Sequence, residues 1–173
     1  MGRDKATLRV QGEAMAVRVA TALQDAGAVE VIAVGGDAAA LEDLGLRVVP
    51  DDEPGAGPFP ATLTALRHLS TEIVVVLSCD LVAPSSATIG ALVERLHSCG
   101  SEVHGAVPLV EGNPQWTHAV WRRAALDALV AARTAGVRSL RRAADHVVID
   151  LVQGVPAADV ADADDPLDLP GAR

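Results

Sequence analysis

Asp80 is the residue with the clearest chemical potential, because it ends an apolar run rich in β-branched residues, Val74-Val75-Val76-Leu77-Ser78-Cys79. Such a run, followed by a helical pattern, is typical of a strand buried on both faces of a parallel sheet. Open α/β sheets bind ligands at the carboxyl ends of their strands. A carboxylate there can hold Mg²⁺ on the phosphates of a nucleotide, since Mg²⁺ needs few protein ligands when phosphates supply the rest. The alternative is an aspartate that caps the following helix, and the stretch alone fits both.

Two cationic side chains near the amino terminus could contact a triphosphate. Arg3 and Lys5 lie in the segment Met1-Gly2-Arg3-Asp4-Lys5-Ala6. Lysine and arginine are the usual donors to phosphoryl oxygens. A terminal pair of cations is often just solvated, so charge alone leaves both interpretations open.

A loop rich in glycine and proline follows a short strand pattern. Gly55, Gly57 and Pro58 could let the backbone approach a ligand closely, and Asp51 at the start of the loop could accept hydrogen bonds from a base or ribose. The alternative is a connecting turn with a solvated aspartate, and spacing alone favours the turn.

The carboxyl-terminal residues 159–173 are acidic and contain proline. Asp162 and Asp164 stand two residues apart and could complete a metal site with Asp80. A solvated acidic tail is the alternative interpretation of this stretch.

The net charge of −9 argues against a protein that binds long nucleic acids through their phosphates. It does not oppose a single nucleotide, because charges farther away than about 8 Å are screened at physiological salt. We therefore expect no nucleic-acid partner and a small-molecule substrate.

The cysteines and histidines show no metal-binding spacing, and we assign the histidines no catalytic role. Cys79, next to Asp80, is expected to be a small buried apolar residue rather than a reactive thiolate. The sequence contains no apolar run long enough to span a membrane and no signal-peptide pattern. These features predict a soluble, cytoplasmic protein with reduced thiols and no membrane contact.

Helical and strand patterns alternate along the chain and predict one domain over residues 1–173. Helices are predicted at 13–25, 38–44, 61–69, 85–99 and 122–135, with Gly27 after the first and a serine cap before the fourth. Buried strands are predicted at 29–34 and 73–78, further strands at 46–49, 102–107 and 146–151, and an exposed strand at 115–121. Repeated strand-helix units with short loops indicate a doubly wound, mostly parallel sheet with helices on both faces.

Four segments together resemble the molybdenum cofactor guanylyltransferases. They are residues 1–6, Pro54-Gly55-Ala56-Gly57-Pro58, Ser78-Cys79-Asp80-Leu81, and Asp162-Ala163-Asp164-Asp165-Pro166-Leu167-Asp168-Leu169, in the family's order and spacing. The resemblance implies a Rossmann-like, nucleotidyltransferase-like fold and a Mg²⁺-dependent enzyme that joins GMP from GTP to molybdopterin, releasing pyrophosphate. Two further alternatives stay open: transfer to another acceptor or of another base, such as cytidylyl transfer, and a catalytically inactive binding or accessory protein that docks to other cofactor-assembly proteins.

The resemblance also implies roles for individual residues. Lys5 is similar to the family lysine on the GTP phosphates, with Arg3 as a second cation, and Asp80 to the aspartate that holds Mg²⁺. Asp51 is similar to the aspartate on the guanine side, next to the loop of Gly55, Gly57 and Pro58. The closing motif of the family carries two asparagines, which are replaced here by Asp162 and Asp164.

The family begins with a strand and a glycine-rich phosphate loop that precede the Met-Gly-x-Asp-Lys segment, whereas this sequence starts at that methionine. The first strand of the sheet is therefore expected to be missing. Its loss would leave the strands at 29–34 and 73–76 without a shared neighbour.

Overall fold

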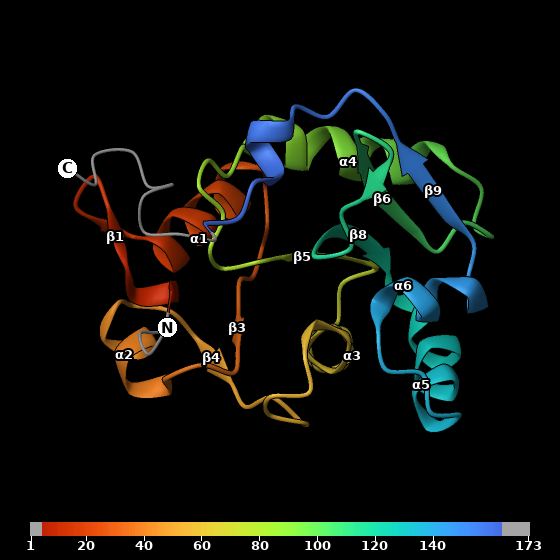
Figure 1. The fold of residues 1–173 in the computed structure, drawn as a ribbon, viewed down its shortest axis with the longest axis horizontal. Helices are drawn as coiled ribbons and strands as arrows, with labels where there is room; N and C mark the ends of the chain where they lie inside the picture. Colours follow the sequence, from red (N-terminus) through yellow and green to blue (C-terminus); the bar gives the residue numbers. More distant parts are fainter. Residues whose placement is uncertain (1–4, 164–173) are drawn as a thin grey trace.

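The computed structural model describes residues 5–163 (Figure 1). Its strands are β1 (Arg9–Val10), β2 (Glu13–Ala14), β3 (Ala33–Val34), β4 (Val48–Val49), β5 (Ile73–Leu77), β6 (Gly105–Val110), β7 (Asn113–Pro114), β8 (His118–Arg122) and β9 (Ile149–Val152). Its α-helices are α1 (Met15–Asp25), α2 (Ala38–Asp43), α3 (Pro58–His68), α4 (Ser86–Ser98), α5 (Leu126–Thr134) and α6 (Leu140–Ala143). Short 3₁₀ turns are η1 (Lys5–Thr7), η2 (Arg123–Ala125), η3 (Ala144–His146) and η4 (Ala157–Val160).

The main sheet is built around β8, which lies between β5 and β6. β8 is antiparallel to both neighbours, and β9 runs parallel to β6 on the other side. Three of these strands, β5, β6 and β9, therefore share one direction. β3 and β4 form a separate parallel pair, and β1 and β2 form a small antiparallel pair. This is the predicted α/β, Rossmann-like architecture, with a mixed sheet in which most main strands point the same way.

Helices cover both faces of the main sheet. Side chains on successive strand residues point to opposite faces, so each strand packs against helices on both sides. In β8, Ala119 and Trp121 pack in the cluster that contains α3 and α5, whereas Val120 packs against α4. Val74 and Val75 of β5 divide between the same two clusters. Val74 is buried and the other residues of β5 are half-buried, so this strand contributes to two cores but is less buried than the sequence predicts.

Local signals place several helix ends where the sequence predicts them. α1 ends at Asp25, and Gly27 has the positive φ of 93° that glycine adopts without a steric penalty. The hydroxyl of Ser85 accepts a hydrogen bond from the Thr88 amide at 3.3 Å and caps α4.

The prediction of an exposed strand at 115–121 was wrong, since every residue of β8 is buried. The strand lies in the interior of the sheet between β5 and β6, a position that local alternation of residue types cannot reveal. The prediction that a helix begins at residue 122 was also wrong, because Arg122 is the last residue of β8.

The strand predicted over residues 29–34 forms only at its end, Ala33–Val34, and both of these residues are half-buried rather than buried. Val29 is 86% exposed. The predicted loop before residue 61 is shorter than expected, because α3 already begins at Pro58, where the missing amide and fixed φ of proline suit the first helical turn.

No helix within residues 5–163 is long and apolar enough to cross a bilayer.

Candidate functional site

The turn that follows β5 carries Asp80 and brings it to Lys5. The Nζ atom of Lys5 lies 3.1 Å from Oδ2 of Asp80, although the two residues are 75 positions apart in the chain. The hydroxyl of Ser78 donates a short hydrogen bond to Oδ1 of the same carboxylate. The Asp80 side chain is 15% exposed and that of Lys5 is 30% exposed, so both remain within reach of a ligand from solvent.

The electrostatic balance at this turn keeps Asp80 ionised. Burial by itself raises the pKa of the Asp80 carboxyl, because a charged group loses hydration. The hydrogen bonds from Ser78 and Lys5 and the positive charge of Lys5 outweigh that effect, and the net pKa of Asp80 lies below its usual value. The site therefore presents a carboxylate and an ammonium group side by side at neutral pH.

Ala6 next to Lys5 is buried in a cluster with Ala16 of α1 and Leu41 of α2, which fixes the backbone that carries the lysine. Arg3, the other predicted cation, lies outside the described residues. The structure therefore positions Lys5, but it provides no description of Arg3.

Asp51 and the Gly55–Pro58 loop form a second segment, after β4. A Cβ atom added at Gly35, which follows β3, would lie 3.3 Å from the Cβ of Asp51. Asp51 is thus held against the ends of β3 and β4, and its Oδ1 accepts the Glu53 amide at 3.0 Å. Gly55 and Gly57 are exposed, have φ of 76° and 91°, and have open space where a Cβ would be.

Two ion pairs anchor this loop to the helices beside it. Arg67 of α3 lies 2.5 Å from the Asp52 carboxylate, and Arg133 of α5 forms a two-point contact with Glu53. The hydrogen bond from Arg133 is the main reason that the pKa of Glu53 is lowered. The contacts of this loop run to α3 and α5, so it is a separate segment from the Lys5–Asp80 pair.

Residues 161–163 of the carboxyl-terminal segment lie across the turn of Asp80. The sequence suggests that this segment could reach Asp80, but it does not indicate by which contacts. The Ala163 amide donates to the Asp80 carbonyl at 2.9 Å, and the Val82 amide donates to the Ala161 carbonyl at 3.0 Å. Asp162 itself pairs with Leu81 in this short antiparallel bridge. Asp164, the other predicted metal ligand of this segment, lies outside the described residues.

His118 is a residue that the sequence analysis set aside. It is 2% exposed, and its Nε2 lies 3.4 Å from Oδ1 of Asp162. The β5–β8 register pairs it with Leu77, three positions before Asp80. A lone histidine in an apolar strand gives no local signal that it will contact Asp162. Its neighbours come from strand pairing and from a segment 44 residues later in the chain.

The chemistry of this donor set fits a divalent cation only in part. Asp80 can supply carboxylate oxygens to Mg²⁺, which commonly binds one or two protein carboxylates together with substrate phosphates. Within residues 5–163 no group of three or more His, Cys, Asp or Glu residues is placed to hold a metal ion. An Mg²⁺ ion at Asp80 would therefore depend on oxygens from a ligand.

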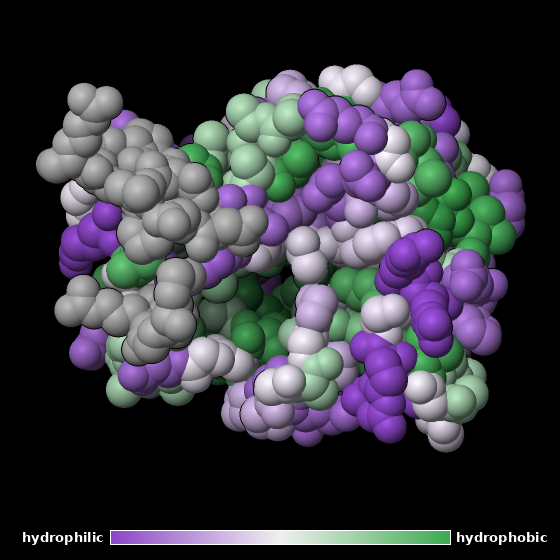
Figure 2. All heavy atoms as spheres, viewed as in Figure 1, coloured by the Kyte–Doolittle hydropathy of each residue, from purple (hydrophilic) through white to green (hydrophobic). Residues whose placement is uncertain are grey.

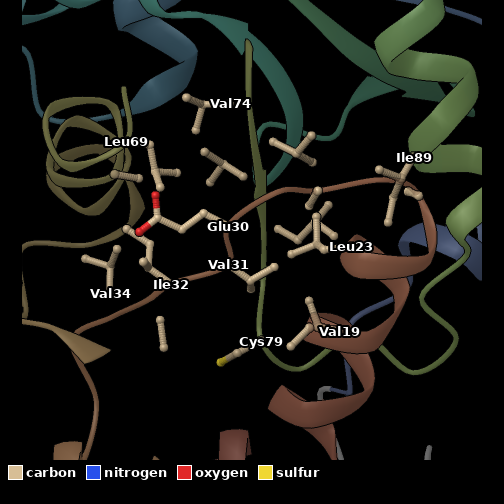
Figure 3. Close-up of a pocket in the computed structure, with 18 of the residues that line it drawn as sticks. Val19, Leu23, Glu30, Val31, Ile32, Val34, Leu69, Val74, Cys79 and Ile89 are labelled. Carbon is tan, nitrogen blue, oxygen red and sulfur yellow. The ribbon is translucent and has the colours of Figure 1, made fainter. Parts of the chain in front are cut away.

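A cleft of about 480 Å³ opens beside the site. Apolar side chains of α1 and α4, among them Val19, Leu23 and Ile89, and Leu69 after α3 line it (Figure 3). Figure 2 shows a hollow with apolar residues inside it. Residues 28–36, which include β3, and 71–77, which include β5, also line it.

Within residues 5–163, β3 pairs with β4 and β5 pairs with β8, and no strand joins β3 to β5. The cleft explains why residues 29–34 are less buried than predicted. The expectation that Cys79 is buried was wrong, because Cys79 is exposed and is one of the residues that line the cleft.

A family model described as the MobA-like NTP transferase domain matches residues 1–147. A probable molybdenum cofactor guanylyltransferase of Chloroflexus aggregans is 31% identical over 142 residues, which cover 81% of this chain and 68% of that protein. The protein with the same name in Haloferax mediterranei is 35% identical over 118 residues, 65% of this chain and 54% of that one. In Opitutus terrae the matching protein of that name is 35% identical over 95 residues, and the match spans 47% of its length. The matches thus span from about half to two thirds of these relatives.

Solved structures show the same fold at low sequence identity. Molybdopterin-guanine dinucleotide biosynthesis protein A from Archaeoglobus fulgidus superposes with a TM-score of 0.69 at 19% identity, covering 88% of this chain and 76% of that one. The 2-C-methyl-D-erythritol 4-phosphate cytidylyltransferase of Thermus thermophilus gives 0.73 at 21% identity, covering 95% and 90%. These two likenesses establish the architecture, and the family model over residues 1–147 establishes the family. The chain belongs to the MobA-like NTP transferase domain family.

Proposed function

We propose that this chain transfers GMP from GTP to molybdopterin, releases pyrophosphate, and so forms the guanine dinucleotide of the molybdenum cofactor. The observation that carries the proposal is the contact of 3.1 Å between Lys5 and Asp80 at the carboxyl end of β5. It pairs a phosphate-binding cation with a carboxylate suited to a metal ion. The names of the relatives from Chloroflexus aggregans and Haloferax mediterranei support the choice of substrates.

In the proposed reaction, a phosphate oxygen of molybdopterin forms a bond to the α-phosphorus of GTP. The bond from that phosphorus to the bridging oxygen of the pyrophosphate breaks, and the electron pair leaves with pyrophosphate. No covalent bond to the protein forms, so the protein contributes by positioning and by charge stabilisation.

Each site residue has a defined part in this scheme. Lys5 donates hydrogen bonds to the phosphates, and to do so it exchanges part of its contact with Asp80. Asp80 binds Mg²⁺, which would neutralise phosphate charge when bound. Asp51 and the exposed Gly55–Pro58 loop shape the pocket for guanine, since the open space at Gly55 and Gly57 lets a base approach the backbone.

The test is turnover of GTP with molybdopterin, followed as pyrophosphate release. Asp80→Asn is expected to lower turnover by about 10²-fold or more, the scale seen when one charge-stabilising group is removed. Asp43→Asn, an exposed residue of α2, is the matched control and should leave turnover unchanged. Near-normal turnover of Asp80→Asn would contradict the metal-binding role.

Substitution of CTP for GTP tests the base. A preference for CTP would replace guanylyl transfer with cytidylyl transfer at the same site. Absence of both turnover and saturable, Mg²⁺-dependent GTP binding by the unmodified protein would instead favour the non-catalytic binding protein.

A further inference from the structure

We propose that His118 is a positioning residue that acts through Asp162 to hold the turn of Asp80 in its working shape. The inference rests on the proposed function, because it concerns the same site, but it starts from a buried group that the proposed chemistry does not use. His118 is 2% exposed, and its Nε2 atom makes no well-formed hydrogen bond within residues 5–163. A buried ring nitrogen normally has a partner, and Asp162 Oδ1 at 3.4 Å is the carboxylate oxygen that it faces.

The neighbours of the His118 ring allow a tautomer in which Nε2 carries the proton. Oγ1 of Thr117 lies 3.3 Å from Nδ1 of His118. The Thr117 hydroxyl can donate to Nδ1, which leaves Nε2–H to donate to the Asp162 carboxylate. In this tautomer the Thr117 hydroxyl is the partner of Nδ1, and Nε2–H faces the Asp162 carboxylate at 3.4 Å.

The turn that carries Asp80 is held from two directions, and the His118–Asp162 contact joins them. On the β8 side, the Ser78 amide donates to the Thr117 carbonyl at 2.9 Å. On the other side, the Ala163 amide donates to Asp80 and the Val82 amide to Ala161, at 2.9 and 3.0 Å. β8 and the carboxyl-terminal bridge are distant in sequence.

The direction of the side chains supports an indirect role. In the short bridge, Asp162 pairs with Leu81 and Ala163 is bonded to Asp80, so Asp162 and Ala163 point to opposite faces. Asp162 faces His118, whereas Asp80 faces Lys5. His118 therefore acts on Asp80 through the backbone of the bridge and does not touch the reacting groups.

The test compares His118→Phe, which keeps a ring of similar size but has no donor, with His118→Gln, whose amide nitrogen can donate from a similar position. Amide hydrogen exchange of Val82 and Ala163 is the first readout. We expect His118→Phe to speed exchange at both amides by about tenfold or more, and His118→Gln to restore much of the protection. His68→Phe, an exposed histidine of α3, is the matched control.

Turnover supplies a second readout. His118→Phe should raise the Mg²⁺ concentration needed for half-maximal turnover several-fold, with a smaller change in kcat at saturating Mg²⁺, because the carboxylate is present but poorly placed. Asp162→Ala, on an exposed residue, should produce the same changes even if His118→Phe does not fold. The effects of the two substitutions should not add when combined, since both break one contact.

The results separate the two proposals. Unchanged exchange at Val82 and Ala163 in both Asp162→Ala and His118→Phe would overturn the role of His118, as would equal effects of His118→Gln and His118→Phe. An unmodified protein that transfers no nucleotide would defeat the proposed function, while the exchange measurement would still decide whether the His118–Asp162 contact holds the turn.

Discussion

Replacing Arg122 with methionine should destabilise the protein strongly, because the buried guanidinium joins β8 to three other segments. Nε donates to the Val103 carbonyl at 3.0 Å, and Nη1 to the Glu72 carboxylate at 2.9 Å. Nη2 donates to the carbonyls of Leu96 and Cys99 at 2.8 and 3.4 Å, at the carboxyl-terminal end of α4. Leu96 lies in the last turn of α4 and Cys99 directly after the helix, and the Leu96 carbonyl also accepts the Cys99 amide at 3.2 Å.

The expected loss is about 3 kcal/mol of unfolding free energy. Leu96 is completely buried, and its carbonyl would keep the Cys99 amide but lose a hydrogen bond from a charged donor, which contributes about 1.5–3 kcal/mol. The carbonyls of Val103 and Cys99 are only partly buried and add about 0.5–1 kcal/mol each. The Glu72 side chain is 79% exposed, so that ion pair adds little. Methionine keeps most of the apolar stem volume, which limits any cavity.

Urea unfolding followed by circular dichroism measures this loss. An unchanged slope of the unfolding free energy against urea concentration indicates that two-state unfolding is retained. Arg95→Met is the matched control, because Arg95 contacts Asp150 at 2.6 Å on the exposed face of α4. That pair should contribute no more than about 1 kcal/mol. A loss for Arg122→Met as small as that of the control would refute the reasoning.

Two further predictions concern acid and the apolar cleft. Because the pKa of Asp80 is lowered in the folded protein, its ionisation stabilises the fold above the unfolded value near pH 4, and this contribution is lost as the pH falls through the folded value. Between about pH 6 and about pH 2.5, the unmodified protein should therefore lose more stability than Asp80→Asn in urea unfolding, and parallel pH curves would contradict this. An apolar fluorescent dye such as ANS should bind the cleft, and Leu23→Glu in its wall should at least halve the fluorescence. Leu151→Glu is the control, at an exposed position of β9 that does not line the cleft, and it should leave the fluorescence unchanged. Equal effects of the two substitutions would show that the dye binds elsewhere.

Most helix ends could be predicted because their signals are local. Ser85 caps α4 with the side chain expected of that position. Gly27 follows α1 with a positive φ, and Pro58 starts α3. α3 begins at Pro58, earlier than the predicted residue 61, and this difference also follows from a local rule, because proline is permitted in the first helical turn.

The sheet order could not be predicted from local patterns. The segment that forms β8 alternates in residue type like a strand with one exposed face, but tertiary pairing buries all of it between β5 and β6. Residues 29–34 carry the composition of a buried strand, yet all of them line a cleft because β3 pairs with β4 on one edge and faces the cleft on the other. Burial depends on the neighbours of a strand, which lie far away in the sequence.

The sequence by itself determined the alternation of strands and helices and the placement of Asp80 after an apolar strand, since both follow from residue types within a few positions of each other. Tertiary structure alone decided that Lys5 lies 3.1 Å from Asp80 and that His118 faces Asp162. These contacts join residues that are 75 and 44 positions apart in the chain. The Lys5–Asp80 contact also needs the packing of Ala6 against α1 and α2, and the His118–Asp162 contact needs the register of β5 with β8 and the carboxyl-terminal bridge. Both are properties of the packed molecule.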